Sequence, residues 1–373
     1  MSARPVTRFE LPDELSATRP AEARGLSRDG VRLLVVDERR VEHARFRDLP
    51  CFLEAGDLLV VNTSGTLTAA ADGRRAGGAD VVVHFSTLLD DGEWVVELRT
   101  APRAARPVLD ARPGETLTLS GGASISLLGG YPETGDGPDG DGGTRLWRSR
   151  FSWSEPAPVF LERFGRPIAY GYVTDRWPAA SYQTVFANEP GSAEMPSAAR
   201  PFTQELVTDL VAAGILIAPL VLHTGVSSQE PGEPPLPERF RVPAATARLV
   251  GWTRASGGRV IAVGTTAARA LESATRPDGA VVPARGWTEL VLGPDRLPRV
   301  VDGLITGMHA PDASHLLLLE AVAGPELVQR GYAAALQRRY LWHEFGDVSL
   351  LLPEKGRHRM TDAELLAASV AGS

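Results

Sequence analysis

The residues best suited to contact a ligand are Gly264, Thr265 and Thr266, which join an apolar run at 259–263 to a run of helix-forming residues at 266–273. The first N–H groups of a helix have no acceptor inside the helix, and with the positive end of the helix dipole they attract anions. A glycine lets the backbone approach a ligand closely, and two hydroxyls add further donors. The pattern predicts a turn that binds a carboxylate or ribose hydroxyls, and an ordinary N-capped strand–helix junction remains the alternative.

Two histidines follow predicted strands directly. His223 ends the apolar run at 215–222, and His309 comes just after a run at 300–305. Ligands of α/β sheets collect at strand ends, and a neutral imidazole there can accept a proton. Both are therefore candidate general bases, and a hydrogen-bonded structural histidine is the open alternative for each. The other histidines lack such a position, and no two histidines have the short spacing of a metal site, so we expect no metal.

The elements that must position these residues fall into two kinds. Residues 72–154 carry short alternating strands separated by turn residues, which predicts a small antiparallel barrel, with a sandwich as the alternative. The remainder alternates helices with apolar strands, which is typical of an α/β domain. We therefore expect a discontinuous α/β main domain at 1–71 plus 155–373, with an inserted β-barrel domain at 72–154. The expected helices are 203–213, 244–256, 266–273 and 325–343, and the expected strands include 31–36, 56–62, 215–222, 259–263 and 300–305.

The composition limits the partners. The chain has 373 residues and a net charge of −7, so it is not attracted to nucleic acid as a whole, although local arginine clusters could still contact RNA. Its single cysteine, Cys51, has apolar neighbours and is expected to be packed. No apolar run reaches the roughly 20 residues that span a bilayer, and the stretch at 1–15 lacks an apolar signal core. We expect a cytoplasmic monomer with no membrane partner.

Two loops and two arginines have simple interpretations. Residues 131–143 hold Asp136, Asp139 and Asp141 but lack the glutamate that closes a calcium loop, so we expect a solvated loop. Residues 227–237 are too rich in proline for a strand or helix interior. Arg330 and Arg338 lie off the apolar stripe of the helix at 325–343, so we expect both in solvent.

These segments, taken in order, resemble the S-adenosylmethionine:tRNA ribosyltransferase-isomerase family. The resemblance spans nearly the whole chain, and its most specific part is Val263 to Thr266 followed by Arg269, Leu271 and Glu272. The other matching motifs are 9–12, 32–34, 56–60 with Asn62, Tyr182-Gln183-Thr184-Val185, Gly191, 196–198, Leu222-His223 before Gly225, 301–302, Thr306, His309, Pro311, Tyr340 and 346–347.

The resemblance implies a fold, a reaction and a site. The family fold is a large α/β domain interrupted by a small β-barrel. Its reaction moves the ribosyl part of S-adenosylmethionine onto a 7-aminomethyl-7-deazaguanine base in tRNA, giving epoxyqueuosine, adenine and methionine. The donor is a co-substrate, no cofactor is bound permanently, and its sulfonium acidifies the neighbouring carbon, so a modest base suffices. The implied donor-binding residues are Gly264, Thr265, Thr266, Arg269, Tyr182, Gln183 and Thr184, the candidate bases are His223 and His309, and the proline-rich loop is a candidate lid.

This chain departs from the family pattern within the matched motifs. Gly65 stands where the family has an arginine, Pro201 where it has a histidine, and Gly307 where it has an asparagine. Arginine and histidine are the residues that bind phosphates and transfer protons. Two alternatives to the tRNA reaction therefore stay open: the same donor chemistry on a small-molecule acceptor, and a non-catalytic relative that binds a nucleoside or RNA.

Overall fold

The computed structural model describes residues 4–132, 144–173, 175–226, 235–311 and 313–354. The chain forms two compact units. Unit 1 comprises Met1–Thr63, Ser197–Leu222 and Ser228–Ser373, and unit 2 comprises Ser64–Pro196 and His223–Ser227. Each unit is described separately below.

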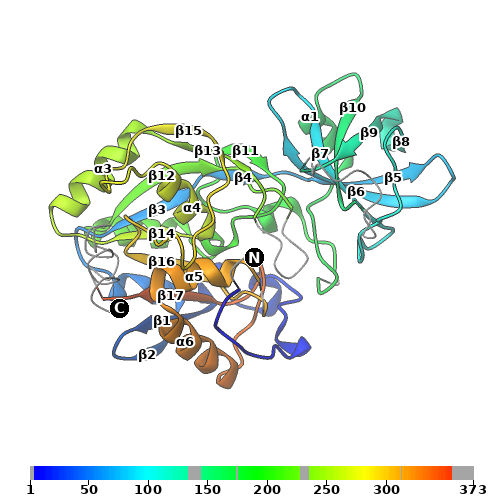
Figure 1. Cartoon of the computed structure of the whole chain (residues 1–373). Coiled ribbons are helices and arrows are strands. Elements are labelled where there is room, and N and C mark those ends of the chain that lie inside the picture. The colour runs from blue at the N-terminus through cyan, green and yellow to red at the C-terminus, as the bar shows by residue number, and fades with distance from the viewer. Residues whose placement is uncertain (1–3, 133–143, 174, 227–234, 312, 355–373) are drawn as a thin grey trace, which may run out of the picture. The chain divides into compact units, whose positions relative to one another are not determined.

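Unit 1 is built on a large mixed sheet (Figure 1). Its four central strands, β12, β3, β14 and β16, run parallel, so their carboxyl ends lie at one edge of the sheet. The other neighbours of this group, β13 and β17, run antiparallel to it. Among the described residues the strand order is β15 (Ala284–Thr288), β13 (Glu238–Val242), β12 (Leu216–Leu222), β3 (Leu58–Asn62), β14 (Val260–Val263), β16 (Gly303–Gly307), β17 (Val348–Leu352), β1 (Arg32–Asp37) and β2 (Val41–Arg45).

The strands in the middle of the sheet have apolar residues on both faces. Every residue of β3 and β14 is buried, as the continuous apolar runs require of parallel strands covered on both sides. Helices α3, α4, α5 and α6 pack on the sheet and share its main hydrophobic core. Their bounds are α3 (Ala244–Ala255), α4 (Thr265–Ser273), α5 (His315–Ala323) and α6 (Pro325–Gln337); α2 (Gln204–Ala212) contacts β12.

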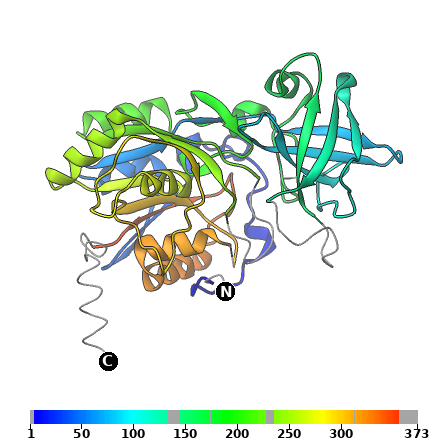
Figure 2. The same ribbon diagram turned by 45° about the horizontal axis from the view of Figure 1, so that its top comes forward.

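Unit 2 contains a closed antiparallel barrel, and Figure 2 shows its strands wrapping round one another. Closure leaves no exposed strand edge. Helix α1 (Ala157–Phe164) supplies Phe160, which packs against Phe85 and Phe151 of the barrel. The barrel order is β10 (Leu146–Ser152), β7 (Trp94–Thr100), β6 (Asp80–Leu88), β5 (Ala70–Arg75), β8 (Thr116–Leu119) and β9 (Ser124–Gly130), and a separate parallel pair joins β11 (Glu189–Ser192) to β4 (Ser64–Thr66).

The predicted fold class is confirmed: an α/β main part accompanies a small antiparallel barrel, and the sandwich alternative is wrong. The predicted domain limits at 72 and 154 stay a prediction. Thr203 caps α2 as expected, since its side chain accepts a hydrogen bond from the Leu206 amide. The helix expected at 325–343 ends at Gln337, because Arg339 adopts a positive φ of 54°.

The expectation for Cys51 is wrong, because its side chain is exposed. Arg330 and Arg338 are exposed, as predicted. Asp136, Asp139 and Asp141 lie outside the described residues, as does most of the proline-rich loop, at 227–234. Over the described part of the chain, no helix combines the length and apolar character needed to cross a bilayer.

Candidate functional site

The turn between β14 and α4 has a backbone that only glycine adopts readily. Gly264 has φ 94° and ψ 151°, and its N–H donates to the Ile305 carbonyl at 2.8 Å. A Cβ added there would lie 3.5 Å from Cβ of Ala198. Among the described residues no side chain caps α4. The first amides of α4 are thus left for a ligand or solvent, in contrast to a side-chain-capped junction.

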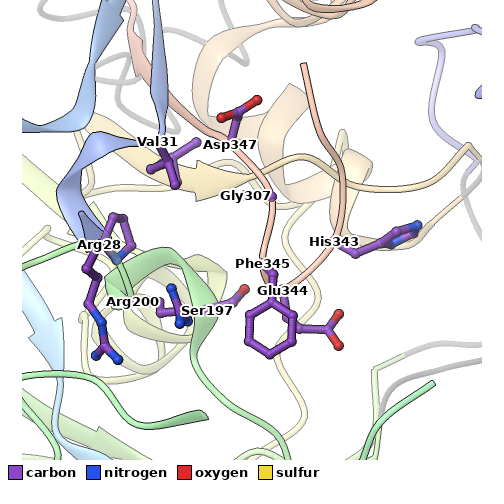
Figure 3. Close-up of a pocket in the computed structure, with 12 residues that line it drawn as sticks. Arg28, Val31, Ser197, Arg200, Gly307, His343, Glu344, Phe345 and Asp347 are labelled. Atoms are coloured by element: carbon purple, nitrogen blue, oxygen red, sulfur yellow. The ribbon is translucent and has the colours of Figure 1, made fainter. Parts of the chain in front are cut away.

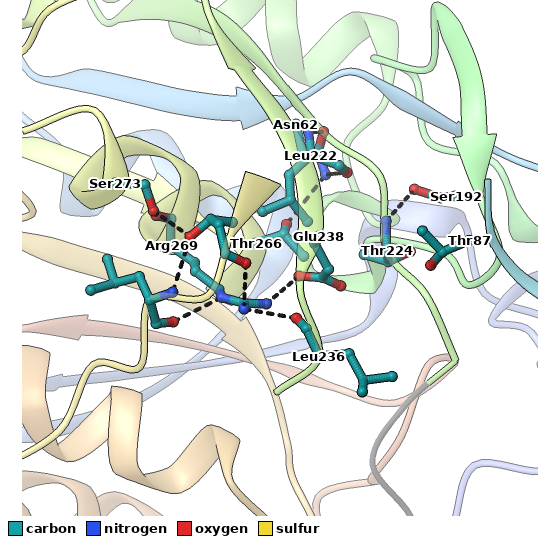
Figure 4. Close-up of polar contacts among 12 residues, drawn as sticks. Asn62, Thr87, Ser192, Leu222, Thr224, Leu236, Glu238, Thr266, Arg269 and Ser273 are labelled. Atoms are coloured by element: carbon teal, nitrogen blue, oxygen red, sulfur yellow. Dashed lines mark hydrogen bonds and ion pairs between the residues drawn. The ribbon is translucent and has the colours of Figure 1, made fainter. Parts of the chain in front are cut away.

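Asn62 organises the neighbouring strand end. It is fully buried at the end of β3, where its amide nitrogen donates to the Leu222 carbonyl at 2.8 Å and its amide oxygen accepts from the Leu222 N–H at 3.0 Å. The same nitrogen lies 3.4 Å from Oγ1 of Thr266 (Figure 4). Asn62 therefore holds the end of β12 and orients a hydroxyl of the Gly264 turn. Sequence reasoning used Asn62 only as a motif residue, although a polar side chain ending an apolar strand was a usable signal.

Arg269 points into the protein behind the turn. Nη1 pairs with Glu238 at 2.5 Å, and Nη2 donates to the carbonyls of Leu236 and Thr288 at 2.8 and 2.9 Å. Nε donates to the Leu290 carbonyl at 2.9 Å. Arg269 therefore braces α4 against the chain around β13 and β15 (Figure 4). These contacts suit a positioning residue, and the direct donor contact implied by the resemblance stays a prediction.

His309 lies at the next strand end, just after β16. Its Nε2 is 2.8 Å from Oγ1 of Thr306, its backbone N–H donates to the Tyr332 hydroxyl at 3.1 Å, and its carbonyl accepts from the Trp342 indole at 2.8 Å. The ring stacks on His315 of α5, with centroids 4.6 Å apart and planes inclined by 6°. The imidazole is therefore fixed in both position and orientation.

Burial keeps this histidine cluster neutral. Removal from water lowers the pKa of His309 well below its usual value, and the neighbouring His315 and His343 lower it further. Burial likewise lowers the pKa of His315 to about 4 and that of His343 to about 4. A neutral imidazole can accept a proton, so the site offers a base without a carboxylate. Sequence reasoning missed His315, because its pairing with His309 depends on how the intervening chain folds back.

His223 belongs to unit 2 and ends a chain of hydrogen bonds. Its Nδ1 is 2.7 Å from Oγ of Ser64, which is 2.6 Å from Oγ of Ser192. On the other side, Nε2 is 3.7 Å from the Glu189 carboxylate. A Cβ at Gly191 would lie 2.4 Å from Nδ1, so only glycine leaves room for this ring. We call Ser192, Ser64, His223 and Glu189 the serine relay. Hydrogen bonds join Ser192, Ser64 and His223, so a proton can pass along that part, whereas Glu189 lies at ion-pair distance from the ring.

The segment from Tyr182 to Thr184 also meets β4. Gln183 pairs with the backbone of Thr66: its side-chain oxygen accepts from the Thr66 N–H at 3.0 Å, and its amide donates to the Thr66 carbonyl at 2.7 Å. Tyr182 and Thr184 are buried, and the Thr184 hydroxyl has no hydrogen-bond partner among the described residues. In unit 2 the structure therefore brings Gln183 and His223 to one strand.

The predicted residues thus form two sets, each within one unit. Gly264, Thr265, Thr266 and His309 gather with Asn62 at the carboxyl ends of β3, β14 and β16 in unit 1. His223 and Gln183 share β4 in unit 2. Over the described parts of the chain, no three His, Cys, Asp or Glu side chains are arranged to hold a metal ion.

Comparisons with known proteins agree on one family. A family model described as "Queuosine biosynthesis protein" matches residues 6–351. The S-adenosylmethionine:tRNA ribosyltransferase-isomerase of Sphingopyxis alaskensis is 37% identical over 94% of this chain and 97% of its own length. The protein of the same name from Symbiobacterium thermophilum is 36% identical over 92% of this chain and 98% of its own length. A crystal structure of S-adenosylmethionine tRNA ribosyltransferase from Thermotoga maritima covers 92% of this chain and 99% of that chain, with 28% identity and a TM-score of 0.49.

Proposed function

Because the chain belongs to the queuosine biosynthesis protein family, we propose that it is an S-adenosylmethionine:tRNA ribosyltransferase-isomerase. It transfers and isomerises the ribosyl moiety of S-adenosylmethionine onto a 7-aminomethyl-7-deazaguanine base in tRNA, and releases adenine and methionine. The observation that carries the proposal is the Gly264 turn, whose amides no side chain caps and which follows β14, the strand paired with the one that precedes His309, in a chain that matches the family over nearly its full length.

The Gly264 turn is the proposed donor site. The free amides of α4 and the hydroxyls of Thr265 and Thr266 hydrogen-bond the polar groups of the donor. Asn62 fixes Thr266, and Arg269 braces the helix that presents the amides. Tyr182, Gln183 and Thr184, all in unit 2, remain candidate donor residues. Gln183 acts through β4, and the buried Thr184 hydroxyl has no hydrogen-bond partner among the described residues.

The proposed base is His309. The sulfonium of the donor acidifies its neighbouring carbon, and a neutral imidazole removes that proton without having to lose one first. The hydroxyl of Thr306 contacts one ring nitrogen, which leaves the other for the substrate. The serine relay around His223 is the second candidate for proton transfer. It acts in the later step, in which adenine leaves and protons are exchanged.

The experiment that tests this function is chromatography of S-adenosylmethionine incubated with the protein and with tRNA that carries the 7-aminomethyl-7-deazaguanine base. Adenine and methionine should appear together, in amounts equal to the modified tRNA, and only when this tRNA is present. Absence of adenine under every condition contradicts the proposal and leaves the binding relative as the explanation. A tRNA substrate supports the proposed cytoplasmic location, and the monomeric state stays a prediction.

A small-molecule acceptor is the second candidate. The net charge of −7 and the glycine at position 65 favour it, because neither attracts a polyanion. The free 7-deazaguanine base replaces tRNA in the same assay. Adenine release with the free base, and none with tRNA, assigns the activity to a small acceptor.

A further inference from the structure

The connection between β7 and β8 of the barrel has no part in the reaction proposed above. It covers residues 101–115 and belongs to unit 2. Arg103, Arg106 and Arg112 are exposed along it. None of these three side chains forms a hydrogen bond or an ion pair within the part of the chain that the structure describes. Their guanidinium groups can therefore receive an anionic partner without first leaving a carboxylate.

Other arginines of the protein differ in this respect. In unit 1, Arg28 and Arg200 line a small pocket (Figure 3), and Glu22 accepts a hydrogen bond from each of them at 2.9 Å. In unit 2, the exposed Arg74 pairs with Asp80 at 2.8 Å. The positive charge of these arginines is already matched, so they are weaker candidates for binding an anion than the arginines of 101–115.

The carboxylates within the connection have a partner of their own. Asp110 and Glu115 are its acidic residues, and Arg75 of β5 binds both, with Nη1 2.7 Å from Asp110 and Nε 2.6 Å from Glu115. Counted with Arg75, the connection has four arginines and two carboxylates, a net charge of +2. It is therefore locally positive in a chain whose net charge is −7.

A buried ion pair fixes the shape of the connection. Glu97 and Arg99 of β7 are 0% and 3% exposed, and Oε1 of Glu97 lies 2.8 Å from Nη1 of Arg99. Arg99 also donates from Nε to the Ala104 carbonyl at 2.5 Å and from Nη2 to the Ala105 carbonyl at 3.1 Å. Ala104 has a φ of 53°, which is unusual for a residue with a side chain. Because a buried ion pair adds little stability by itself, we assign this one to shaping the turn.

The fixed turn places an exposed arginine on each side of the two carbonyls that Arg99 binds. Arg103 precedes them and Arg106 follows them. The backbone at Arg106 is held as well: its carbonyl accepts from the Thr100 N–H at 2.9 Å, and its N–H donates to Oγ1 of Thr100 at 3.2 Å. A backbone that is already ordered loses less entropy when its side chains bind a partner.

We propose that the 101–115 connection docks the phosphate backbone of tRNA through Arg103 and Arg106, an inference that rests on the proposed function. A guanidinium donates two parallel hydrogen bonds to a phosphate, and such contacts position a nucleic acid without reading its sequence. An acidic protein therefore needs a local basic surface of this kind to hold an RNA. Arg112 lies farther along the connection and extends the positive surface. The two arginines contribute to tRNA affinity and take no part in the chemical step.

The test measures the dissociation constant of tRNA by fluorescence anisotropy over a series of salt concentrations. In the Arg103→Gln/Arg106→Gln double variant, affinity should fall roughly tenfold to fiftyfold near 100 mM salt, because two phosphate contacts are lost. The slope of log affinity against log salt should become shallower by about 1.4 to 1.8. In the adenine-release assay KM for tRNA should rise with the dissociation constant, while kcat stays within about twofold. Affinity for S-adenosylmethionine should not change.

The matched control removes the same charge from paired arginines. Arg150 and Arg163 are exposed residues of unit 2 that pair with Glu93 and Glu155. Arg150→Gln/Arg163→Gln should change tRNA affinity by less than about threefold and keep the wild-type salt slope. The acidic stretch at 133–143 lies outside the described residues and is identical in all the proteins compared. The difference between the two double variants therefore reports on Arg103 and Arg106 alone.

Each other outcome decides against the docking surface. Unchanged tRNA affinity in Arg103→Gln/Arg106→Gln overturns it, and so does an equal loss in both double variants, which would follow from net charge. If Arg103→Gln/Arg106→Gln keeps tRNA affinity but loses binding of poly-glutamate, the connection binds an acidic protein and the proposal is wrong. In these cases a wild-type protein that releases adenine with tRNA keeps its proposed function. A wild-type protein that neither binds tRNA nor releases adenine overturns both.

Discussion

The strand-end site of unit 1 and the serine relay of unit 2 use histidine in opposite ways. His309 is half-buried and stacked on a second histidine, and removal from water lowers its pKa well below the usual value. His223 instead is hydrogen-bonded to the Ser64 hydroxyl and lies 3.7 Å from the Glu189 carboxylate, so a proton can move between the imidazole and the serine hydroxyls. The first arrangement keeps the imidazole unprotonated and so able to accept a proton, although its lowered pKa makes it a weaker base than an exposed histidine. The second arrangement suits a group that exchanges protons with its neighbours. The two environments therefore predict different roles for the same residue type.

Removing each imidazole in turn is the most direct test of the two roles. His309→Ala should lower kcat for adenine release by roughly 10²–10⁴-fold, with a smaller effect on KM for the donor, because a positioned base acts in the transition state. His223→Ala should lower kcat less. His43→Gln, on the edge strand β2, is the control and should leave turnover unchanged. A larger loss in His223→Ala would move the base to the serine relay, and full turnover in both variants would remove both candidates.

Stability against pH tests the neutral state of the His309 cluster. The folded protein binds these protons at a lower pH than the unfolded chain does. The stability that the neutral histidines contribute is therefore complete above pH 6.5 and is lost as the pH falls towards 4. At about 1.4 kcal/mol per pKa unit, each histidine accounts for a loss of roughly 3 kcal/mol over this range. His315→Phe keeps a stacking ring without a titrating group and should remove about half of the combined loss for His315 and His343. Denaturant titrations at several pH values measure this, and equal pH slopes for wild type and variant would contradict the assignment.

The Gly264 turn can be compared with another turn of unit 1 that has a glycine at positive φ. Gly264→Ala places a Cβ in a region that only glycine populates freely, which costs about 1–3 kcal/mol of stability and shifts the amides of α4. Donor affinity should fall by roughly tenfold or more. Gly257→Ala is the matched control, because Gly257 also has a positive φ, 83°, and a Cβ there meets nothing within 4 Å. It should lose stability and keep donor affinity, and equal affinity losses in both variants would show that the turn has no special part in binding.

The fold was predictable because its signals are local. The buried strand β3 and the β14–Gly264–α4 junction can be read from apolar runs and helix formers. The site was less predictable, because its contacts join distant segments: Ser64 meets Ser192 and His223 only after the chain has folded. The contacts of Arg269 could not be predicted, because its acceptors are mostly backbone carbonyls, which no side-chain pattern reveals.

Cys51 shows that the composition of a segment does not by itself predict which of its side chains are buried. Its neighbours are apolar, but the segment is a 3₁₀ helix (Phe46–Phe52), in which residues three apart share a face. Phe46 and Leu49 occupy the buried face, so Cys51 points out. Apolar neighbours therefore predict burial only when the helical period is known.

The smallest expected effect concerns the serine relay itself. Ser64→Ala leaves His223 Nδ1 and the buried Ser192 hydroxyl without the oxygen that joins them, which should cost about 1–3 kcal/mol of unfolding free energy. Ser126→Ala, on the exposed side of the barrel, replaces a hydroxyl of the same kind and should cost about 0.5 kcal/mol or less. If the relay only holds the His223 ring in place, the decrease of kcat in Ser64→Ala is explained by the lost stability and by the freer rotation of the ring. If it carries protons, Ser64→Ala also shifts the pH profile of kcat, whereas Ser64→Thr restores the profile by returning a hydroxyl to the same place. An unaltered profile in Ser64→Ala would reduce the relay to a structural contact and leave His309 as the acid–base group of the two regions.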